Sequence, residues 1–427
     1  MRFETLHPAD QLVEMMNRIY YGGMTTVSGG NLSVRDGEGN IWITPTSVDK
    51  GGLTRGDICC VHPDGSVEGP YAPSVELPFH SHIYRIRPDI GAIVHAHPPA
   101  LVGFSLARLV PDVELLPGLK GLCGGASMAA YDVPGSKQLG ENIAKEFAKG
   151  YDTILMENHG LVIGKKDLQQ AFRTFEAMEF LARTQIGASR LGKLIKPSCG
   201  TEQTLRPPFL ETVNRGPAGV RERALRRDLC ALLRRAYGQK LVSADFGEFS
   251  ARVDGNSFLI TPFGADRKLL EMEDLVLVRD GKCESGKTPD CHVRFHQALY
   301  EANADAQALF LARPSSAMAF AVSDAAFDAR TIPESYIMLR FPLRLPYGSL
   351  RAEPERTARR LSLKTPVALV ENDCLCAMGT TPLNAFDRIE VAEFSAASLL
   401  NCAAVGEAVK ISDEEVRQIE KDFHLPV

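Results

Sequence analysis

Apolar residues recur at helical spacing in several stretches of the first half of the chain. Leu12, Met15, Met16 and Ile19 fall on one helix face, and this pattern predicts a helix over residues 11–21. The same spacing predicts further helices over residues 77–87, 136–149 and 168–186. The apolar runs between these stretches are too short for helices and are typical of strands.

Several of these short runs can be assigned to individual strands. LSVRD and NIWITP flank DGEGN, and the glycine-containing turn between them predicts a β-hairpin. AIVHAH, over residues 92–97, and TILMENHG, from Thr153, predict two further strands. Because strands and helices follow one another in mixed order, the pattern favours an α/β layered domain over a simple series of parallel βαβ units.

The pattern occurs twice along the chain. GGNLSVRDGEGNIWITP from Gly29 resembles FGEFSARVDGNSFLITP from Phe246, and GAIVHAHPPALVGFS from Gly91 resembles QALFLARPSSAMAFA from Gln307. TILMENHGLVIG likewise resembles VALVENDCLCAMG, and the offset between the copies stays between 214 and 217 residues. An offset this steady indicates tandem copies of one fold.

The length of the chain agrees with two domains. Its 427 residues exceed the roughly 150 that are typical of one domain. The repeat predicts one domain over residues 1–200 and a second over residues 221–427. Prolines and glycines without apolar period gather between them, so residues 201–220 are predicted to be a linker.

Charge and composition argue against several kinds of partner. A net charge of −5 provides no basic stripe that would attract nucleic acid or an anionic membrane. No apolar run approaches the roughly 18 residues of a membrane helix, and the N-terminus does not resemble a signal peptide. The ten cysteines lack CxxC spacing, so neither a zinc ribbon nor a disulfide framework is predicted. We therefore expect a cytoplasmic protein that acts on a small molecule.

Two histidines at the end of a predicted strand form a candidate metal site. Alternation along a strand places His95 and His97 on the same face, so both can reach one ion. His159, where a second apolar strand ends, would complete the three imidazoles of a catalytic zinc site. Pro98 and Pro99 stop the strand and leave the rings at an edge. Taken alone, the HxH pair is equally compatible with hydrogen-bonded structural histidines.

Five segments together resemble a known family. GGNLSVR, ITPTSVD, APSVELPFHSHIYRIRPD, IVHAHPP and MENHGLVIG occur in the order seen in the class II aldolase/adducin family, over about residues 8–195 and more weakly over 225–400. The resemblance implies two tandem α/β layered domains, each with a central, largely antiparallel sheet flanked by helices. It also implies that His95, His97 and His159 hold Zn²⁺, with Mn²⁺ or Fe²⁺ as alternatives.

The same resemblance assigns candidate catalytic residues. Glu76 matches the family's acid/base glutamate, and Tyr131 matches a tyrosine that these aldolases use for proton transfer to the aldehyde. On the residues alone, a favourable first-turn position in a helix explains Glu76 better than catalysis does, and a core aromatic explains Tyr131 nearly as well as a catalytic role. His80 and His82 are interpreted as structural or surface residues, because a spacing of two places them on different helix faces.

A substrate-phosphate cradle is also implied by the resemblance. Backbone amides and hydroxyls would form a neutral anion nest, and the matching residues are Gly30, Asn31, Thr46, Ser47 and Ser74. The sequence departs from the family at two positions. Val75 replaces a second serine, and Ser47 stands where a glycine is usual, which weakens the inference of a phosphorylated substrate.

The second copy lacks the candidate ligands. His95 is matched by Leu311, His97 by Arg313, His159 by Asp373 and Glu76 by His292, so no metal site is predicted there. The resembling enzymes form fourfold rings, and a two-domain chain therefore suggests a homodimer that builds a pseudo-fourfold ring. In such a ring, Arg313 or Tyr336 would complete the pocket of the first domain.

The function expected from these observations is a zinc-dependent aldolase. It would cleave a ketose, with a sugar phosphate as the expected substrate, into a dihydroxyacetone-type unit and an aldehyde. Sugar-phosphate epimerases, dehydratases and decarboxylases share the scaffold and remain alternatives. A non-enzymatic scaffold like the adducin head is a further alternative, but it has no need of Glu76 and three histidines together.

Overall fold

The computed structural model describes residues 3–197 and 206–425, which form two compact units. We call the first domain the unit that ends at Ala182 and the second domain the unit that follows from Arg183 on, which also includes Glu114–Gly118. The division falls within one long helix, α6 (Leu168–Leu191). Each domain is described by itself.

The first domain is built on an eight-stranded sheet with the order β4-β3-β2-β1-β5-β8-β7-β6. Its strands are β1 (Asn31–Arg35), β2 (Ile41–Ile43), β3 (Cys59–Val61), β4 (Val67–Glu68), β5 (Ala92–Ala96), β6 (Ala126–Ala129), β7 (Thr153–Met156) and β8 (Leu161–Lys165). Only the β6–β7 pair is parallel; the other neighbours in this sheet run antiparallel.

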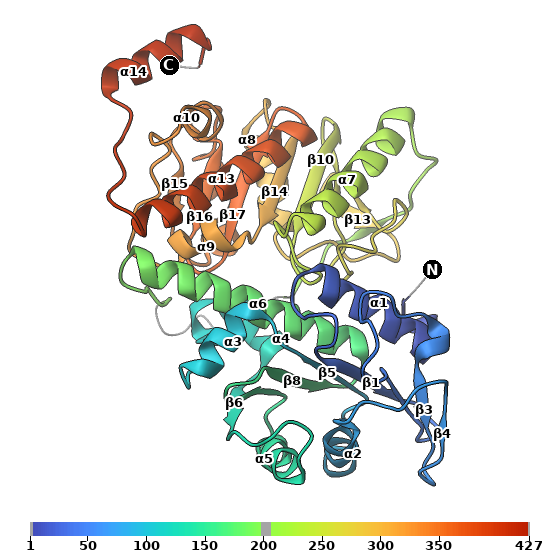
Figure 1. The fold of residues 1–427 in the computed structure, drawn as a ribbon. Coiled ribbons are helices and arrows are strands. Elements are labelled where there is room, and N and C mark those ends of the chain that lie inside the picture. Colours follow the sequence, from blue (N-terminus) through green and yellow to red (C-terminus); the bar gives the residue numbers. More distant parts are fainter. Residues whose placement is uncertain (1–2, 198–205, 426–427) are drawn as a thin grey trace. The chain divides into compact units, whose positions relative to one another are not determined.

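Helices cover both faces of this sheet (Figure 1). α2 (Leu77–Ile86) and α5 (Lys137–Ala148) lie on one face, where Phe79 and Phe147 join an apolar core with the sheet residue Ile154. α1 (Pro8–Tyr21) and α6 lie on the other. Shorter helical segments are α3 (Pro99–Leu106), α4 (Lys120–Cys123) and the 3-10 turns Phe3–Thr5, Arg55–Asp57, Val113–Leu115 and Pro117–Leu119. The sheet is therefore the middle of three layers.

The second domain repeats this architecture. Its nine-stranded sheet has the order β15-β16-β17-β14-β10-β11-β12-β13-β9. When the first sheet is read from β6 to β4, the two orders correspond strand by strand, and β9 is an added edge strand. The strands are β9 (Thr212–Val213), β10 (Glu248–Asp254), β11 (Ser257–Ile260), β12 (Val276–Arg279), β13 (Lys282–Glu284), β14 (Ala308–Ala312), β15 (Leu343–Leu345), β16 (Val367–Val370) and β17 (Cys374–Gly379).

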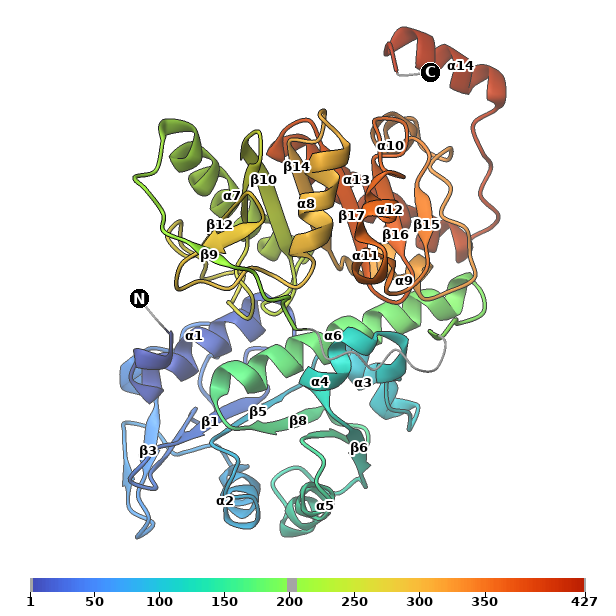
Figure 2. The same cartoon turned by 180° about the vertical axis from the view of Figure 1, so that it is seen from behind.

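Helices again cover both faces of the second sheet (Figure 2). On one face, Phe295 and Leu299 of α8 pack on the apolar sheet residues Leu309 and Leu311. The helices are α7 (Val220–Gly238), α8 (Val293–Ala302), α9 (Ser315–Ala321), α10 (Pro333–Leu339), α11 (Ser349–Ala352), α12 (Pro354–Ala358), α13 (Pro382–Ala403) and α14 (Asp413–Asp422).

Strand register confirms the internal repeat. Asn31 pairs with His95 between β1 and β5, and Glu248 pairs with Leu311 between β10 and β14. An isolated bridge between two prolines also occurs in both copies, Pro45 with Pro73 and Pro262 with Pro289. The prediction of two tandem α/β layered domains with largely antiparallel sheets is therefore confirmed.

Two local predictions differ from the structure. The strand predicted over residues 92–97 ends at Ala96 and lies inside the sheet between β1 and β8, so the histidines stand at the end of an internal strand and not at a sheet edge. Of the predicted linker, residues 201–205 lie outside the described residues. Thr212–Val213 forms β9 and pairs with β13, so this part of the predicted linker belongs to the second sheet.

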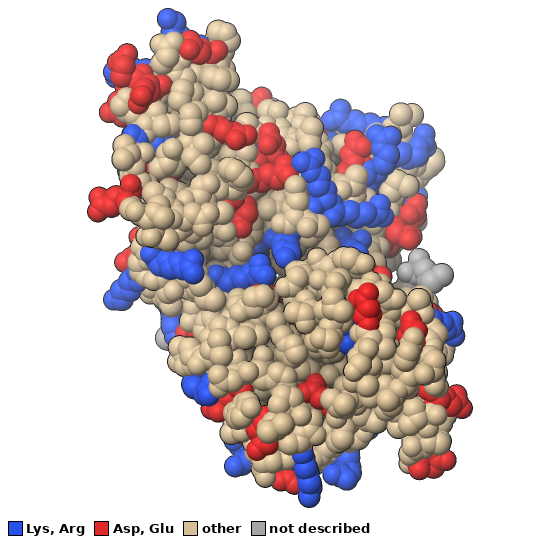
Figure 3. Space-filling view, viewed as in Figure 1, with Lys and Arg blue, Asp and Glu red and all other residues tan. Residues whose placement is uncertain are grey.

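Basic side chains gather over α7 in the second domain (Figure 3). Each of its exposed arginines has a partner in that domain: Arg221 donates to Gln307, Arg223 to Ala218, Arg227 to Asp228, Arg234 to Leu270 and Arg235 to Glu390. The exposed arginines of this surface therefore all make contacts within the second domain. Within the described part of the chain, no helix has both the length and the apolar character needed to cross a bilayer.

Candidate metal centre

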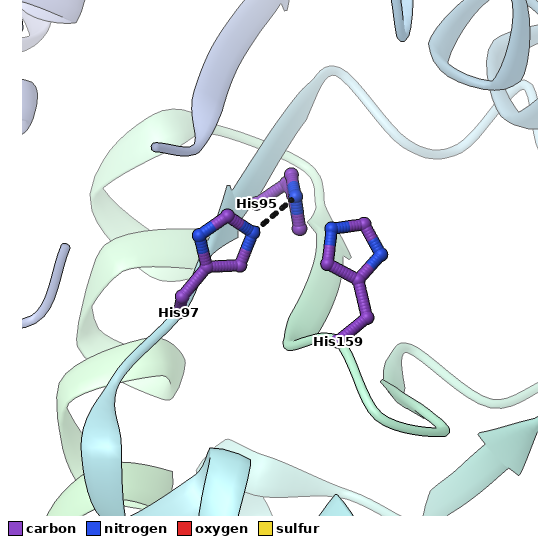
Figure 4. A group of neighbouring side chains, drawn as sticks. All are labelled: His95, His97 and His159. Atoms are coloured by element: carbon purple, nitrogen blue, oxygen red, sulfur yellow. Dashed lines mark hydrogen bonds between the residues drawn. The ribbon is translucent and has the colours of Figure 1, made fainter. Parts of the chain in front are cut away.

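Three histidines of the first domain converge on one point (Figure 4). His95 is on β5, His97 directly follows that strand, and His159 lies in the turn between β7 and β8. The Nε2 atoms of His95 and His97 are 3.2 Å apart, and each of the three residues offers a ring nitrogen within 4.8 Å of the others. The structure therefore brings together all three predicted ligands.

The surroundings keep these imidazoles neutral, which is the form that binds metal. The Nδ1 atom of His95 lies 3.0 Å from the carbonyl oxygen of Leu161, and donation to that oxygen leaves the Nε2 lone pair free. Burial, reinforced by the neighbouring imidazoles, lowers the pKa of His95 and of His97 to about 3. Two unprotonated ring nitrogens this close together can both bind one cation.

Local packing also supports a metal ion at this point. Glu76 Oε1 is buried, has no hydrogen-bond partner among the described residues and lies 4.0 Å from His159 Nε2. Three nitrogens at about 2.0–2.1 Å from a tetrahedral ion would stand roughly 3.4 Å apart, close to the separation of His95 and His97. At Gly160 a Cβ atom would come within 2.6 Å of His97 Cδ2, so the missing side chain leaves room for this ring. The residues fit a bound metal.

Glu76 faces the histidines from the start of α2, where it is the N-cap residue. Its Oε2 atom accepts a hydrogen bond from Asn31 Nδ2 at 2.7 Å and lies 3.2 Å from His95 Nε2. Its Oε1 atom lies 4.0 Å from His159 Nε2. The predicted acid/base residue is therefore part of the same buried cluster as the metal ligands.

A chain of hydrogen bonds runs from the core to Glu76. His80 Nε2 contacts Asn31 Oδ1 at 2.6 Å, and His80 Nδ1 contacts Ser33 Oγ at 2.7 Å. Ser33 Oγ in turn lies 2.7 Å from the hydroxyl of Tyr84. The interpretation of His80 as structural is consistent with its complete burial, but the sequence did not indicate that it reaches Glu76 through Asn31.

The donor directions in this chain follow from the bond at Glu76, whose Oε2 atom accepts from Asn31 Nδ2. A carboxylate only accepts, so the Asn31 amide nitrogen faces it and the Asn31 oxygen faces His80. Burial, together with the His95 imidazole, lowers the pKa of His80 well below its usual value, so one ring nitrogen carries the proton. Since Nε2 donates to Asn31, Nδ1 accepts from Ser33, and Ser33 accepts from Tyr84. Every donor therefore points toward Glu76.

The predicted phosphate cradle is partly assembled beside this cluster. Ser74 Oγ accepts a hydrogen bond from the backbone of Glu76 at 3.2 Å, and the backbone of Thr46 donates to Ala72. Ser47 has a φ of 55°, and Gly264 has 71° at the matching place in the second copy. This left-handed backbone explains why a glycine is usual there. Thr46 and Ser47 thus lie in the loop that is tied to the segment before Glu76.

Two of the five cradle residues have other partners. Asn31 uses its amide on Glu76 and His80, so in this structure it orients the carboxylate. Gly30 has a φ of 71°, and a Cβ atom there would stand 2.6 Å from the His95 carbonyl oxygen. Gly30 thus allows its backbone to come close to β5, the strand that carries His95.

Tyr131 stands apart from the histidines. Its side chain is 54% exposed, and its backbone N–H donates to Glu157 Oε2 at 3.1 Å, two residues before His159. The loop that follows it lies near the site, because a Cβ atom at Gly135 would be 3.6 Å from the carbonyl oxygen of Val75. No hydrogen bond within the described residues links the Tyr131 hydroxyl to Glu76 or the histidines.

The sequence reasoning missed two cations near the site. Lys50 is 2% exposed, its Nζ donates to the carbonyl of Pro45 at 2.5 Å, and burial lowers its pKa to about 8. Its counterpart Arg267 donates to Pro262, so a cation at this place in both copies was the available signal. Arg108 contacts Glu157 at 3.3 Å and Asn158, the residues directly before His159.

The second domain holds a buried ion network where the first has its ligands. Arg313 Nη2 contacts Asp373 Oδ1 at 3.0 Å, and His292 Nδ1 contacts Glu248 Oε1 at 2.7 Å. All four side chains are buried. Leu311, at the position of His95, is an apolar core residue.

One sequence expectation about the second domain is wrong. Arg313 is 4% exposed and bound to Asp373, and Tyr336 is fully buried with its hydroxyl donating to Glu420 at 2.7 Å. Neither side chain is free to complete the pocket of another domain.

The chain can now be placed in a family. Residues 10–186 and 227–400 each match the family described as class II aldolase and adducin N-terminal domain. The two segments cover most of the chain, which therefore belongs to the class II aldolase/adducin family in a tandem form.

Named relatives of this chain catalyse more than one reaction. It is similar to an L-fuculose phosphate aldolase from Methanococcus maripaludis, with 32% identity over 179 residues, 40% of this chain and 93% of the relative. A methylthioribulose-1-phosphate dehydratase from Stenotrophomonas maltophilia is 31% identical over 198 residues, 43% of this chain and 92% of the relative. A solved L-fuculose 1-phosphate aldolase matches at 29% identity with a TM-score of 0.42, over 45% of this chain and 91% of its own.

Proposed function

We propose that the first domain is a metal-dependent aldolase that cleaves a ketose, phosphorylated at the ketone end, into a dihydroxyacetone-type unit and an aldehyde. The observation that carries this proposal is the set of three neutral imidazoles around one point with the Glu76 carboxylate beside them. When bound there, zinc, or alternatively manganese or iron, would polarise the substrate's carbonyl and neighbouring hydroxyl oxygens and stabilise developing negative charge.

Glu76 would donate or accept the proton at the substrate carbon beside the carbonyl, where negative charge develops when the carbon–carbon bond is cleaved. Its Oε1 atom is the free end of the carboxylate, and Asn31 fixes the other oxygen, so the orientation of the group is set before the substrate arrives. His95 is fixed in the same way by Leu161. These contacts support a preorganised proton-transfer group next to the ligand set.

The remaining candidates would hold the two ends of the substrate. Thr46, Ser47 and Ser74 supply hydroxyls near Glu76, and they would take the phosphate. Tyr131 would exchange a proton with the aldehyde oxygen, because the loop that follows it borders Val75, directly before Glu76. The names of the relatives, which act on sugar phosphates, support this substrate class.

Metal analysis and a substrate screen test the proposal together. The purified chain should carry about one equivalent of divalent metal, as a three-histidine site predicts, and release aldehyde from a ketose phosphate. Glu76→Gln should lower kcat by roughly 10²- to 10⁴-fold with the metal retained, because it removes the proton-transfer group but none of the three histidines. Unchanged cleavage by this variant would contradict the role given to Glu76.

The same screen separates the alternatives. Loss of water without release of aldehyde would assign a dehydratase, and release of CO₂ a decarboxylase. Inversion at one carbon without cleavage would assign an epimerase. Less than about half an equivalent of metal in unchelated protein would favour a non-enzymatic scaffold, because a three-histidine site with open positions is built to retain its ion.

The oligomeric state is a separate part of the proposal. A homodimer would place four domains of this family in one assembly, as closed symmetry favours for tandem chains. Light scattering of the purified protein should then give twice the 46.6 kDa mass of the chain. A monodisperse monomer would rule out this part alone.

A further inference from the structure

The second domain contains a pocket that the proposed function does not use. It has a volume of about 610 Å³ and is lined by the segment that follows β15, including α11 and α12. Pockets of roughly 300–1,000 Å³ are typical of sites for small molecules. The polar side chains that matter for its chemistry are Tyr347, Arg351, Glu353, Arg356 and Arg360.

The charges around this pocket leave a positive excess. Three arginines and one glutamate give a net charge of +2. Arg356 Nη1 is already paired with Glu353 Oε2 at 2.9 Å, so the excess belongs to Arg351 and Arg360. The Nε atom of Arg351 is buried and has no hydrogen-bond partner among the described residues. A buried guanidinium N–H without an acceptor is costly, and an anionic ligand would supply one.

The pocket is connected to the network that replaces the metal centre. Tyr347 stands two residues after β15, just as Tyr131 stands two residues after β6, so the candidate tyrosine occurs in both copies. Burial and the charge of Asp373 raise the pKa of Tyr347, against the opposing effects of Arg351 and Arg313. The pocket wall is therefore within electrostatic reach of Arg313 and Asp373, the counterparts of two metal ligands.

We propose that this pocket binds a phosphate monoester, held by Arg351 and Arg360 with the Tyr347 hydroxyl beside them, in a domain that no longer binds metal. Arg351 interacts with the Tyr347 hydroxyl, but neither Arg351 nor Arg360 has an ion-pair partner among the described residues. Two such guanidinium groups match the dianion of a phosphate ester, and each presents a planar fork that bonds two phosphate oxygens. Arg313 is already paired with Asp373 and does not line the pocket. The proposed site is a binding site, and it is independent of the function proposed for the first domain.

Hydrogen–deuterium exchange of the full chain locates the binding. Glycerol 3-phosphate is a suitable probe because it is a phosphate monoester without a carbonyl to cleave. It should slow amide exchange in peptides that cover residues 346–360. Inorganic phosphate, added in a parallel arm, distinguishes free phosphate from an ester, and succinate tests whether any dianion suffices. No protection over 346–360, or equal affinity for succinate, would overturn the proposal.

Matched arginine variants test the residues. Arg351→Gln combined with Arg360→Gln should weaken glycerol 3-phosphate binding at least tenfold, as measured by calorimetry, while metal content and cleavage in the first domain stay unchanged. Arg360→Gln alone, at an exposed position, should already weaken binding and guards against misfolding of the double variant. Arg359→Gln is the control, because Arg359 is exposed beside Arg360 but does not line the pocket. Unchanged affinity in the double variant would refute the assignment.

Discussion

The two domains keep the same buried hydrogen bonds at their centre and differ at the end of them. In the first domain Ser33 bonds His80 and Tyr84, each at 2.7 Å. In the second domain Ser250 bonds His296 and Tyr300, each at 2.6 Å. A serine, a histidine and a tyrosine thus join β1 to α2 and β10 to α8 in the same way. This polar core serves the fold, because it persists where no metal ligand does.

Next to this polar core, the two domains place their charged side chains on different elements. In the first domain the carboxylate is on α2, at Glu76, and an amide on β1 holds it. In the second the carboxylate is on β10, at Glu248, and a histidine on α8 holds it. The guanidinium of Arg313 takes the place of the His97 imidazole and pairs with Asp373. A cluster of imidazoles beside a carboxylate and an internal ion network therefore fill the same buried position in the two domains.

Removal of a metal ligand should have the largest effect. His97→Ala should reduce metal affinity by more than about 100-fold, since even residues that only support a ligand are worth 10- to 100-fold. Cleavage should fall in proportion. Metal content by mass spectrometry checks this, with Arg313→Ala, at the matching position, as the control that keeps its metal. Loss of metal from the control, with the chain still folded by circular dichroism, would mean that the second domain also binds an ion.

Disruption of the ion network should destabilise the second domain strongly. Asp373→Ala leaves Arg313 buried without its charged partner, and breaking one side of a buried pair typically costs about 3–5 kcal/mol. Urea unfolding should show this loss, while metal content stays unchanged. A loss below about 1 kcal/mol, the range of exposed pairs, would mean that Arg313 is hydrated in solution.

The stability of the second domain should depend on pH through Glu248 and His292. Burial would raise the pKa of Glu248, but His292 outweighs it and lowers this pKa to about 2, so its contribution is complete above 4.5 and is lost as pH falls toward 2. Burial would lower the pKa of His292, but Glu248 outweighs it and raises this pKa, so that contribution declines as pH rises above 6.5. Unfolding of the second domain, followed from pH 3 to 9, should show maximal stability between 4.5 and 6.5. Glu248→Gln should flatten this maximum.

The hydrogen-bond chain to Glu76 should matter for activity in one domain only. His80→Phe removes the donor to Asn31 and frees the amide that orients Glu76, so kcat should fall roughly 10- to 100-fold with little change in KM. The matched variant His296→Phe removes the same contact to serine in the second domain. It should cost similar stability and leave kcat unchanged. Equal effects on kcat would reduce His80 to a structural residue.

Exchange of the turn residues should have the smallest effect. Ser47 occupies the left-handed region, which costs an ordinary residue roughly 1–2 kcal/mol, so Ser47→Gly should change stability by less than about 1 kcal/mol after the entropy of glycine is included. Gly264→Ser should destabilise the second domain by a similar amount. Thermal unfolding of both variants measures this, and a large loss in Ser47→Gly would show that the Ser47 hydroxyl makes an essential contact.

The fold and the meeting of the three histidines could be predicted because they depend on local pattern and on the repeat. Strand alternation predicts that His95 and His97 lie on the same face. Comparison with Leu311 and Arg313 shows that the strand itself does not require histidines at these two positions. Asn31, His80 and Lys50 could not be assigned in this way. Asn31 meets Glu76 across 45 residues and His80 across 49, and only the folded sheet brings these positions together. No period in the sequence records such a contact.

The ion network of the second domain was hidden for the same reason. Arg313 and Asp373 are 60 residues apart and were read only as lost ligands. Their mutual pairing, and the burial that requires it, appear when β14 and β17 are neighbours in the sheet. The pocket lined by Arg351 and Arg360 could not be predicted from the sequence, because its residues are common surface types. Only the fold of the segment after β15 brings them together.

The chain of donors that ends at Glu76 is interrupted by the Asn31 amide. An imidazole or a hydroxyl can accept a proton on one side and release it on the other, but an amide nitrogen holds its hydrogens throughout. The route from Tyr84 to Glu76 therefore positions the carboxylate and conducts no proton. Whatever proton Glu76 gains or gives up must pass on the side of the histidines, where Oε1 has no hydrogen-bond partner among the described residues and Oε2 lies 3.2 Å from His95 Nε2, so label from deuterated solvent would enter the product only from that side.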